Sequence, residues 1–466
     1  MTFFRKYIMP DKIINYRPVI TTVVAALFLM VISLYNGYPL FGGDTHSYVS
    51  IGFNNYVPID RTPFYGKFIR LTSLWESLWY TVFAQSLILS CLLTRYIELL
   101  YTKKAGTRFI LLCVICIVSF TCVSWIASCL MSDIFTPILL LGILLYLFDK
   151  KASKLRKALY IFVIFIAISQ HNSHFVIASI FSVCLFLFAL IRKNWMWVRK
   201  SATLFVTALA FWLSMCSINY SYGNGFVFSG GVHMFIMSKF AESGILNVYL
   251  NDSCGKKNLK LCACKNDLGT YQWDFMWPAP GTPLQQLDGW GKGKQEYQMI
   301  IHDIFTTPKY LKMFAEKSIT STLKQLSNIQ EFDKPVLLPA TDFGRGFVKD
   351  YFSDEEKEFS RSRQNTDDIN PFACNIYYYL FFVLSSVWIL MFYPVSSNKE
   401  VFRIYCCLVV FLIINAFVTS AFSTVHFRFQ SKVFWVLPAT NAILILKYLQ
   451  RKYFDKIQMV VRESND

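Results

Sequence analysis

The stretch PVITTVVAALFLMVISLYNGYPLFGGDTHSY, residues 18–48, joins an apolar run of membrane-spanning length to a polar loop. A run this long predicts a transmembrane helix. The loop that follows, residues 42–48, carries an acid and a histidine, and nothing in it is typical of a lipid-facing helix. Basic residues precede the run and no small-residue cleavage site follows it, so we expect an uncleaved signal anchor. The sequence therefore predicts polar chemistry held just outside a membrane.

The composition is that of a lipid-embedded protein. Of 466 residues, 55% are hydrophobic and only 16% are charged, whereas soluble domains carry about 25% charge. Apolar runs recur about ten times along the chain. We therefore predict an all-α polytopic transmembrane bundle of about ten spans, at residues 18–38, 74–94, 108–130, 133–148, 157–171, 174–191, 200–219, 375–394, 401–422 and 432–448.

The net charge of +17 follows this topology. If both termini are cytoplasmic, the cytoplasmic segments hold about half of the 46 Lys and Arg residues, and the short outer loops hold few. This positive-inside pattern predicts a multi-pass membrane protein. The excess of positive charge then faces anionic lipid, so the expected partner is the lipid bilayer and no nucleic acid.

The long hydrophilic stretch 220–373 predicts an extracytoplasmic soluble module inserted between spans 7 and 8. Its acids and bases nearly balance, and its Gly, Pro and aromatic content favours a folded unit over a linker. The N-terminal transmembrane region, 1–219, then includes a polar first outer loop at 39–73. The C-terminal transmembrane region with its basic cytoplasmic tail covers 374–466.

Within this predicted module, the spacing of apolar residues after Pro308 predicts a helix near 308–330. The acidic run 354–358 is interpreted as the solvated surface of a helix. Cysteines outside the spans are able to oxidise. A disulfide from Cys254 to either Cys262 or Cys264 fits the spacing, Cys374 is a further candidate, and the pairing stays open.

The first outer loop supplies the leading candidate site residues. Asp44 is expected to act as the catalytic acid or base, with His46 and Tyr48 as neighbouring substrate ligands. The alternative is that Asp44 bonds its own backbone in a turn. Asp60 and Arg61 either contact substrate, with the arginine on a phosphate, or simply pair with each other.

Three later segments add further candidates for substrate binding. Asp133 either starts a helix or contributes a site carboxylate, and together with Asp44 it is a candidate ligand for a divalent cation. His171 and His174 belong to a short polar segment, residues 170–174, that is expected at a hydrated loop tip. Arg428 suits a lipid-linked phosphate, and Lys432 either binds substrate or extends to the membrane surface as an anchor. Those last two candidates lie in residues 425–432.

These motifs in this order resemble the GT-C superfamily of polytopic glycosyltransferases, especially bacterial relatives of the protein O-mannosyltransferases and lipid A aminoarabinose transferases. The resemblance covers the spans and rests on short motifs. It departs from the family pattern in having an aspartate where the third motif usually has Glu, and Phe where the last motif usually has Tyr. The motifs are Gly43-Asp44-Thr45-His46-Ser47-Tyr48, Arg61-Thr62-Pro63-Phe64-Tyr65, Ser132-Asp133-Ile134-Phe135-Thr136-Pro137 and Phe427-Arg428-Phe429 ahead of Trp435-Val436-Leu437-Pro438.

The resemblance implies an integral membrane glycosyltransferase of a bacterial inner (plasma) membrane that uses a polyprenyl-phosphate-sugar donor on the extracytoplasmic face. Asp44 would be the catalytic or acceptor-binding acid, Asp133 a further site acid, and Arg428 the ligand of the polyprenyl phosphate. The acceptor would be an envelope glycan, lipid or protein, and the need for a metal ion stays open.

Three alternatives remain at this stage. An O-antigen-type glycan polymerase or ligase would use similar outer-loop arginines. A transporter or flippase is less expected, because the spans show no buried ionisable residue and no internal repeat. A non-catalytic envelope scaffold would leave the polar loops merely hydrated.

Overall fold

The computed structural model describes residues 16–54, 56–101, 105–329, 342–369, 372–393, 395 and 398–463. Within these ranges the chain is helical, with two isolated β-bridges and no longer strand. Six of the described helical segments are long and apolar enough to cross a membrane, and three further apolar helices are shorter. The chain thus has the architecture of an all-α, multi-pass membrane protein, as predicted, although six such helices are fewer than the ten predicted spans.

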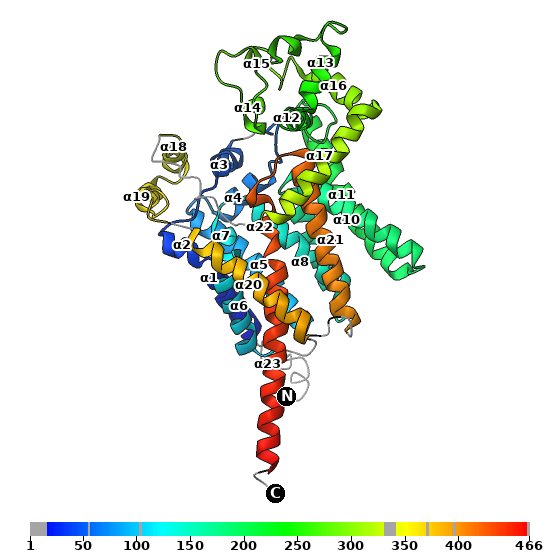
Figure 1. Ribbon diagram of the computed structural model, residues 1–466. Helices are drawn as coiled ribbons and strands as arrows, with labels where there is room; N and C mark the ends of the chain where they lie inside the picture. Colours follow the sequence, from blue (N-terminus) through cyan, green and yellow to red (C-terminus); the bar gives the residue numbers. More distant parts are fainter. Residues whose placement is uncertain are drawn as a thin grey trace, which may run out of the picture.

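Most of the helices build one bundle around a shared apolar core (Figure 1). The long helix α23 extends away from the rest at one end of the molecule. In chain order the bundle contains α1 (Arg17–Leu29), α2 (Val31–Asn36), α3 (Thr45–Phe53), α4 (Phe64–Thr72), α5 (Leu78–Tyr101), α6 (Thr107–Phe120), α7 (Val123–Ser128), η2 (Ser132–Ile134), α8 (Phe135–Phe148), α9 (Lys154–Ser169), α10 (Asn172–Ile191), α11 (Trp195–Ser221), α20 (Phe372–Phe392), α21 (Lys399–Phe422), α22 (Phe427–Phe434) and α23 (Val436–Glu463).

A second apolar core belongs to a group of short helices at the end of the molecule opposite α23, and we call this group the cap (Figure 1). Buried aromatics such as Phe240, Tyr249 and Tyr297 fill that core. Helix α17 then runs from the cap to the bundle and packs along α21, and its bounds confirm the helix predicted near 308–330. The cap contains α12 (Val232–Glu242), α13 (Ile245–Ser253), η3 (Lys260–Cys264), α14 (Gln272–Met276), α15 (Pro283–Gln286) and α16 (Lys294–Thr306), followed by α17 (Pro308–Ser327).

The segment α18 (Asp342–Tyr351), η4 (Ser353–Glu355) and α19 (Glu356–Arg361) packs on the bundle, where it lies beside α3. Its acidic run is not wholly solvated, so that interpretation was wrong for Glu355. This carboxylate is buried and accepts hydrogen bonds from the Tyr38 hydroxyl at 2.6 Å and from Ser77. A buried carboxylate needs such partners because desolvation is costly.

Two predicted spans are interrupted. The run 18–38 is divided at Met30 between α1 and α2. The run 108–130 is divided after Phe120, where Thr121 adopts an extended backbone and its hydroxyl bonds back to the carbonyl of Ile117 at 2.7 Å. Hydrophobicity alone gave continuous spans, because the residues at both breaks belong to uninterrupted apolar runs.

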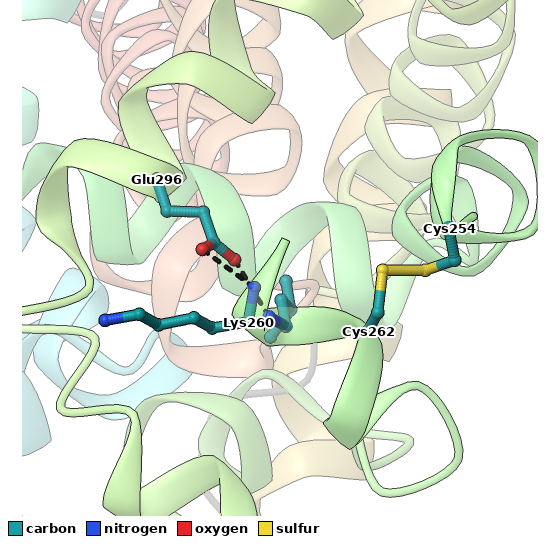
Figure 2. The surroundings of a disulfide bond; sticks show 5 residues. Cys254, Lys260, Cys262 and Glu296 are labelled. Carbon is teal, nitrogen blue, oxygen red and sulfur yellow. Dashed lines mark hydrogen bonds between the residues drawn. A yellow bond between two sulfur atoms is a disulfide. The ribbon is translucent and has the colours of Figure 1, made fainter. Parts of the chain in front are cut away.

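The cap contains a disulfide between Cys254 and Cys262, which is one of the pairings left open by the sequence (Figure 2). Cys264 is free and buried, and the side chain of Cys374 is outside the described residues. The same turn is held by Glu296, whose carboxylate accepts from the backbone N–H groups of Lys260 and Leu261 at 3.0 and 2.8 Å. The loop after α13 is therefore fixed covalently and by hydrogen bonds.

We expect protein extracted without reductant to contain this disulfide. Unfolding in N-ethylmaleimide should label Cys264 and leave Cys254 and Cys262 unmodified in mass spectra. Replacing both bonded cysteines by serine should lower the free energy of unfolding of the cap by about 2–3 kcal/mol, because a closed loop of this length restricts the unfolded chain. Labelling of all three thiols would contradict both the pairing and an oxidising location for the cap.

Candidate active site

The loop that carries Asp44 is attached to the start of α8 by a short backbone bridge. Leu40 N donates to Ser128 O at 3.0 Å, and Leu130 N donates to Leu40 O at 2.8 Å. The Thr45 hydroxyl extends this attachment, because it accepts from Gly42 N at 2.8 Å and donates to Leu130 O at 2.9 Å. The bridge forms where α7 ends, since Cys129 then adopts an extended backbone that can pair with Leu40. Asp44 and Asp133 are thereby brought into one region.

A close crossing of α3 and α4 sets the position of Tyr48. A Cβ atom added at Gly66 would lie 2.6 Å from the carbonyl oxygen of Tyr48, so only glycine permits the two helices to approach this closely. Tyr48 is buried, its hydroxyl lies 2.9 Å from Ser132 Oγ, and its ring lies 5.3 Å from the Arg61 guanidinium carbon. Tyr48, predicted as a substrate ligand, is therefore placed to support Arg61.

Arg428 joins the two predicted site acids. Its Nη2 lies 3.3 Å from Asp44 Oδ2, and its Nε lies 3.2 Å from Asp133 Oδ2. Lys432, one turn further along α22, places Nζ 2.9 Å from Asp133 Oδ1. Opposite charges in contact stabilise one another strongly where water is largely excluded. Residues separated by almost the whole chain thus share one ion network.

Arg61 extends this network on the other side of Asp44. Its Nη1 lies 3.3 Å from Asp44 Oδ1, and its Nε and Nη2 donate to Asp60 Oδ2 at 2.9 and 2.7 Å. Asp60 and Arg61 therefore do pair with each other, and Arg61 also contacts Asp44. Charges of opposite sign alternate through the series Asp60, Arg61, Asp44, Arg428, Asp133 and Lys432, which we call the charge ladder.

The charge ladder is only partly saturated. Arg428 Nε and Arg61 Nη1 are buried, and neither has a hydrogen bond of good geometry among the described residues, although both are close to carboxylates. Asp44 and Arg428 are both partly exposed, so solvent or a ligand reaches them. Burial raises the pKa of the Asp44 carboxyl, but Arg428 and Arg61 outweigh burial and hold this pKa below its ordinary value. Asp44 is therefore ionised at neutral pH.

The three predicted site histidines occupy different environments. His46 lies at the edge of the site with its ring against Phe347, and burial lowers its pKa, so the ring is neutral at pH 7. His171 caps α10 by accepting from Ser173 N at 3.2 Å. His174 is fully buried, with Nε2 2.8 Å from Thr136 Oγ1 and Nδ1 2.8 Å from Ala167 O. The hydrated loop tip expected around His174 is thus wrong, and this residue is placed to join helices.

Two buried lysines correct the sequence interpretation of the last span. Lys432 is 2% exposed and pairs with Asp133, so it does not extend to the membrane surface. Lys447 is also buried in α23 and donates from Nζ to Leu100 O, at the C-terminal end of α5, at 2.6 Å. The premise that the spans contain no buried ionisable residue was therefore wrong. Both ammonium groups have fixed partners within the fold.

Two buried glutamines hold the backbone near the charge ladder. No sequence pattern predicted that either of them would be buried. Gln364 Oε1 accepts from Phe41 N at 2.9 Å, and its Nε2 donates to Phe41 O at 2.7 Å. Gln325 bonds His426 in the same manner, accepting from its N–H at 2.9 Å and donating to its carbonyl at 2.8 Å. One glutamine thus fixes the chain just before Asp44, and the other fixes the chain just before Arg428.

A cavity of about 580 Å³ lies beside α22. Its lining is mainly apolar and aromatic, and none of the predicted site residues contributes to it. Phe434, at the end of α22, does line it, and this residue follows Arg428 by about 9 Å along the helix axis. The full lining comprises Phe120, Thr121, Ser327, Ile329, Asn375, Ile376, Tyr378, Tyr379, Phe382, Phe434, Trp435 and Pro438.

The carboxylates proposed as metal ligands, Asp44 and Asp133, both face Arg428. Among the described residues, no group of three or more His, Cys, Asp or Glu side chains is arranged to hold a metal ion. The acids of the site are thus placed as partners of the guanidinium and ammonium groups.

No protein-family model and no curated protein matches this chain. A similar solved structure is the crystal structure of ArnT from Cupriavidus metallidurans bound to undecaprenyl phosphate. Its sequence is 12% identical, the TM-score is 0.33, and the match covers 92% of this chain and 78% of that chain. That neighbour falls in the class that the sequence motifs resemble, the lipid A aminoarabinose transferases. A TM-score of 0.33 does not establish a shared fold.

The pair formed by Asp133 and Lys432 can be tested by a double-mutant cycle. Lys432→Met should lower the free energy of unfolding by about 3–5 kcal/mol, because Asp133 loses a buried partner. Adding Asp133→Asn to that variant should recover part of the loss, since the carboxylate that lacks its partner is then gone. Thermal or denaturant unfolding of the purified protein measures both effects.

The matched control is Lys309→Met, which removes an exposed lysine paired with Asp252 on the cap surface. A surface pair contributes about 0–1 kcal/mol, so this variant should be close to the wild type. Purely additive losses for the two site substitutions, with no recovery in the double variant, would contradict a direct interaction between Asp133 and Lys432.

Proposed function

We propose that this protein is a membrane glycosyltransferase that moves a sugar from a polyprenyl-phosphate donor to an envelope acceptor. The observation that carries the proposal is Arg428, whose guanidinium is held between Asp44 and Asp133 and whose side chain is still 31% exposed. The exposed part of a guanidinium held in this way is suited to bind a phosphate oxygen.

The cations of the charge ladder suit a lipid phosphate. Arg428 and Arg61 flank Asp44, and Lys432 lies behind Arg428 on the same helix. The cationic side chains are therefore already held in place before a phosphate binds at Arg428. This preorganisation reduces the conformational entropy that the side chains lose on binding. The carboxylates keep the three cations close together despite their mutual repulsion.

The cavity beside α22 suits the lipid tail. Its aromatic and aliphatic lining, including Trp435 and Tyr378, provides an apolar environment for polyprenyl units. Phe434 belongs both to this lining and to the helix that carries Arg428. One helix would then hold the phosphate near its start and border the tail near its end.

The transfer joins an acceptor oxygen to the anomeric carbon of the sugar while the bond from that carbon to the phosphate oxygen breaks. The polyprenyl phosphate departs with the bonding electron pair, and its new charge is stabilised by Arg428. Asp44, with its lowered pKa, is a weak base, so its role is to orient the acceptor hydroxyl and the two arginines. The hydroxyl proton passes to solvent as the new bond forms.

The proposed location is a bacterial inner membrane with both termini cytoplasmic and the cap outside. The disulfide of the cap supports this orientation, because disulfides persist in oxidising compartments. The basic segments between predicted spans, counted on the opposite face, support it independently. In this orientation the charge ladder would face the extracytoplasmic side with the cap.

Asp44→Asn should reduce sugar transfer by about 100-fold, because loss of the carboxylate charge releases Arg61 and Arg428 and misplaces the acceptor hydroxyl. Arg428→Gln should weaken binding of undecaprenyl phosphate, because the guanidinium N–H groups are lost. Transfer is measured with purified protein and a polyprenyl-phosphate-sugar donor, and lipid binding is measured by native mass spectrometry.

Asp252→Asn is the matched control, since this aspartate pairs with Lys309 on the cap away from the charge ladder. It should leave transfer and lipid binding unchanged. All variants are compared at equal amounts of folded protein, because Arg428→Gln also removes a partner of Asp133. Normal transfer by Asp44→Asn would remove its proposed role. A product that carries a preassembled glycan chain in place of one sugar would show a polymerase or ligase.

A further inference from the structure

The cap exposes three large aromatic side chains that lie close together in the sequence. Tyr271, Trp273 and Trp277 are 67%, 49% and 59% exposed, and they lie on or beside α14. Trp273 and Trp277 are four residues apart, and Trp277 N donates to Trp273 O at 2.8 Å. Trp277 is the C-cap residue of α14, so the two indoles lie one helical turn apart along the chain. Exposed aromatic groups of this size mark binding surfaces. We call these three side chains the aromatic platform.

The aromatic platform is rigidly connected to the loop that carries Arg61. Trp277 stacks on Trp290 with ring centroids 5.1 Å apart, and Trp290 Nε1 donates to Met276 O at 3.0 Å. The Trp290 ring in turn lies against Gly231, where an added Cβ would be 2.8 Å from the Trp290 ring and 2.9 Å from the carbonyl oxygen of Ile59. Ile59 lies two residues before Arg61. The stacked tryptophans therefore adjoin the charge ladder through packed backbone.

A second connection leads from α14 to the segment before Arg428. Gln272 is buried, and its Oε1 accepts from Ser423 Oγ at 3.1 Å. Thr424, the next residue, donates to Glu242 of α12. Both contacts attach the cap to the connection between α21 and α22. The aromatic platform is thus fixed relative to both arginines of the site.

The charge of the surrounding segment identifies the chemistry of its occupant. Residues 265–292 contain the acids Asp267, Asp274 and Asp288, have a lysine at each end, and form no basic cluster. Anionic lipid surfaces and nucleic acids attract clusters of basic residues, so this composition disfavours both. A sugar ring has an apolar C–H face that packs on an indole, and hydroxyl groups at its edge that hydrogen-bond to carboxylates and amides. Aromatic rings next to acids match that chemistry.

We infer that the aromatic platform binds the carbohydrate portion of the acceptor. The inference rests on the proposed function and narrows the acceptor to a glycan or glycolipid. Trp273 and Trp277 stack on a sugar unit of the acceptor, and the Trp290 contact sets that unit next to Arg61 and Asp44. Donor and acceptor then reach the charge ladder from two different sides. The donor binds along α22, and the acceptor binds along the cap.

The test is saturation-transfer NMR on the full chain in lipid nanodiscs, with maltotetraose, cellotetraose, chitotetraose and mannotetraose as probes. Magnetisation should pass to ring C–H protons of at least one tetrasaccharide. Trp277→Ala should weaken that binding about tenfold, the equivalent of ~1.4 kcal/mol. Trp277→Phe should retain most of it, because an aromatic face remains. Trp195→Ala, at an equally exposed tryptophan that begins α11, should leave it unchanged.

The same variants distinguish this inference from the proposed function. Trp277→Ala should bind undecaprenyl phosphate as the wild type does, whereas Arg428→Gln should lose the lipid phosphate and keep the tetrasaccharide. The inference would be overturned, with the donor site left intact, if none of the tetrasaccharides received magnetisation. Equal magnetisation with Trp277→Ala and with the wild type would overturn it as well. Broadening of the ¹⁹F signal of 5-fluorotryptophan at position 277 by paramagnetic lipid headgroups would overturn it by placing the ring in the bilayer surface.

Discussion

The ion pairs that Arg428 makes with Asp44 and Asp133 are the interactions on which the rest of the site depends. Asp44 and Arg428 are 384 residues apart, and their contact joins the loop before α3 to the helix that leads into α23. Where water is limited, each charge would be costly without its partner. The network therefore constrains the loop before α3, the turn η2 and the helix α22 to one arrangement, and in that arrangement the Arg428 side chain stays partly exposed.

Hydrogen bonds between uncharged groups of the surrounding fold keep these charged side chains in position. The bridge between Leu40 and Cys129 aligns the loop of Asp44 with the start of α8. Gln364 and Gln325 each satisfy one donor and one acceptor of the backbone close to the arginine and the acid. A buried side-chain amide that makes two hydrogen bonds to the backbone of one residue restricts rotation of that backbone. A preorganised site of this type reduces the reorganisation needed when a ligand binds.

The sequence predicted the parts of this structure that depend on composition. Long apolar runs identified α5, α10, α11, α20 and α21, because hydrophobicity and length alone select a spanning helix. Asp44 and Arg428 stood out as charged residues beside apolar runs, where an unpaired charge is unfavourable. Their mutual contact, the pairing of Lys432 with Asp133 and the burial of Glu355 depend on tertiary packing, which periodicity does not encode. The breaks after α1 and α6 were missed for the same reason. Gln325 and Gln364 resemble any surface glutamine in sequence.

The structure of this protein in a lipid nanodisc with undecaprenyl phosphate, determined by cryo-electron microscopy, tests the central claim most directly. The account predicts the phosphate within hydrogen-bonding distance of the Arg428 guanidinium, with the first prenyl units in the cavity lined by Phe434 and Trp435. A phosphate bound elsewhere, with Arg428 still held only by Asp44 and Asp133, would show that the charge ladder is structural and would contradict the account.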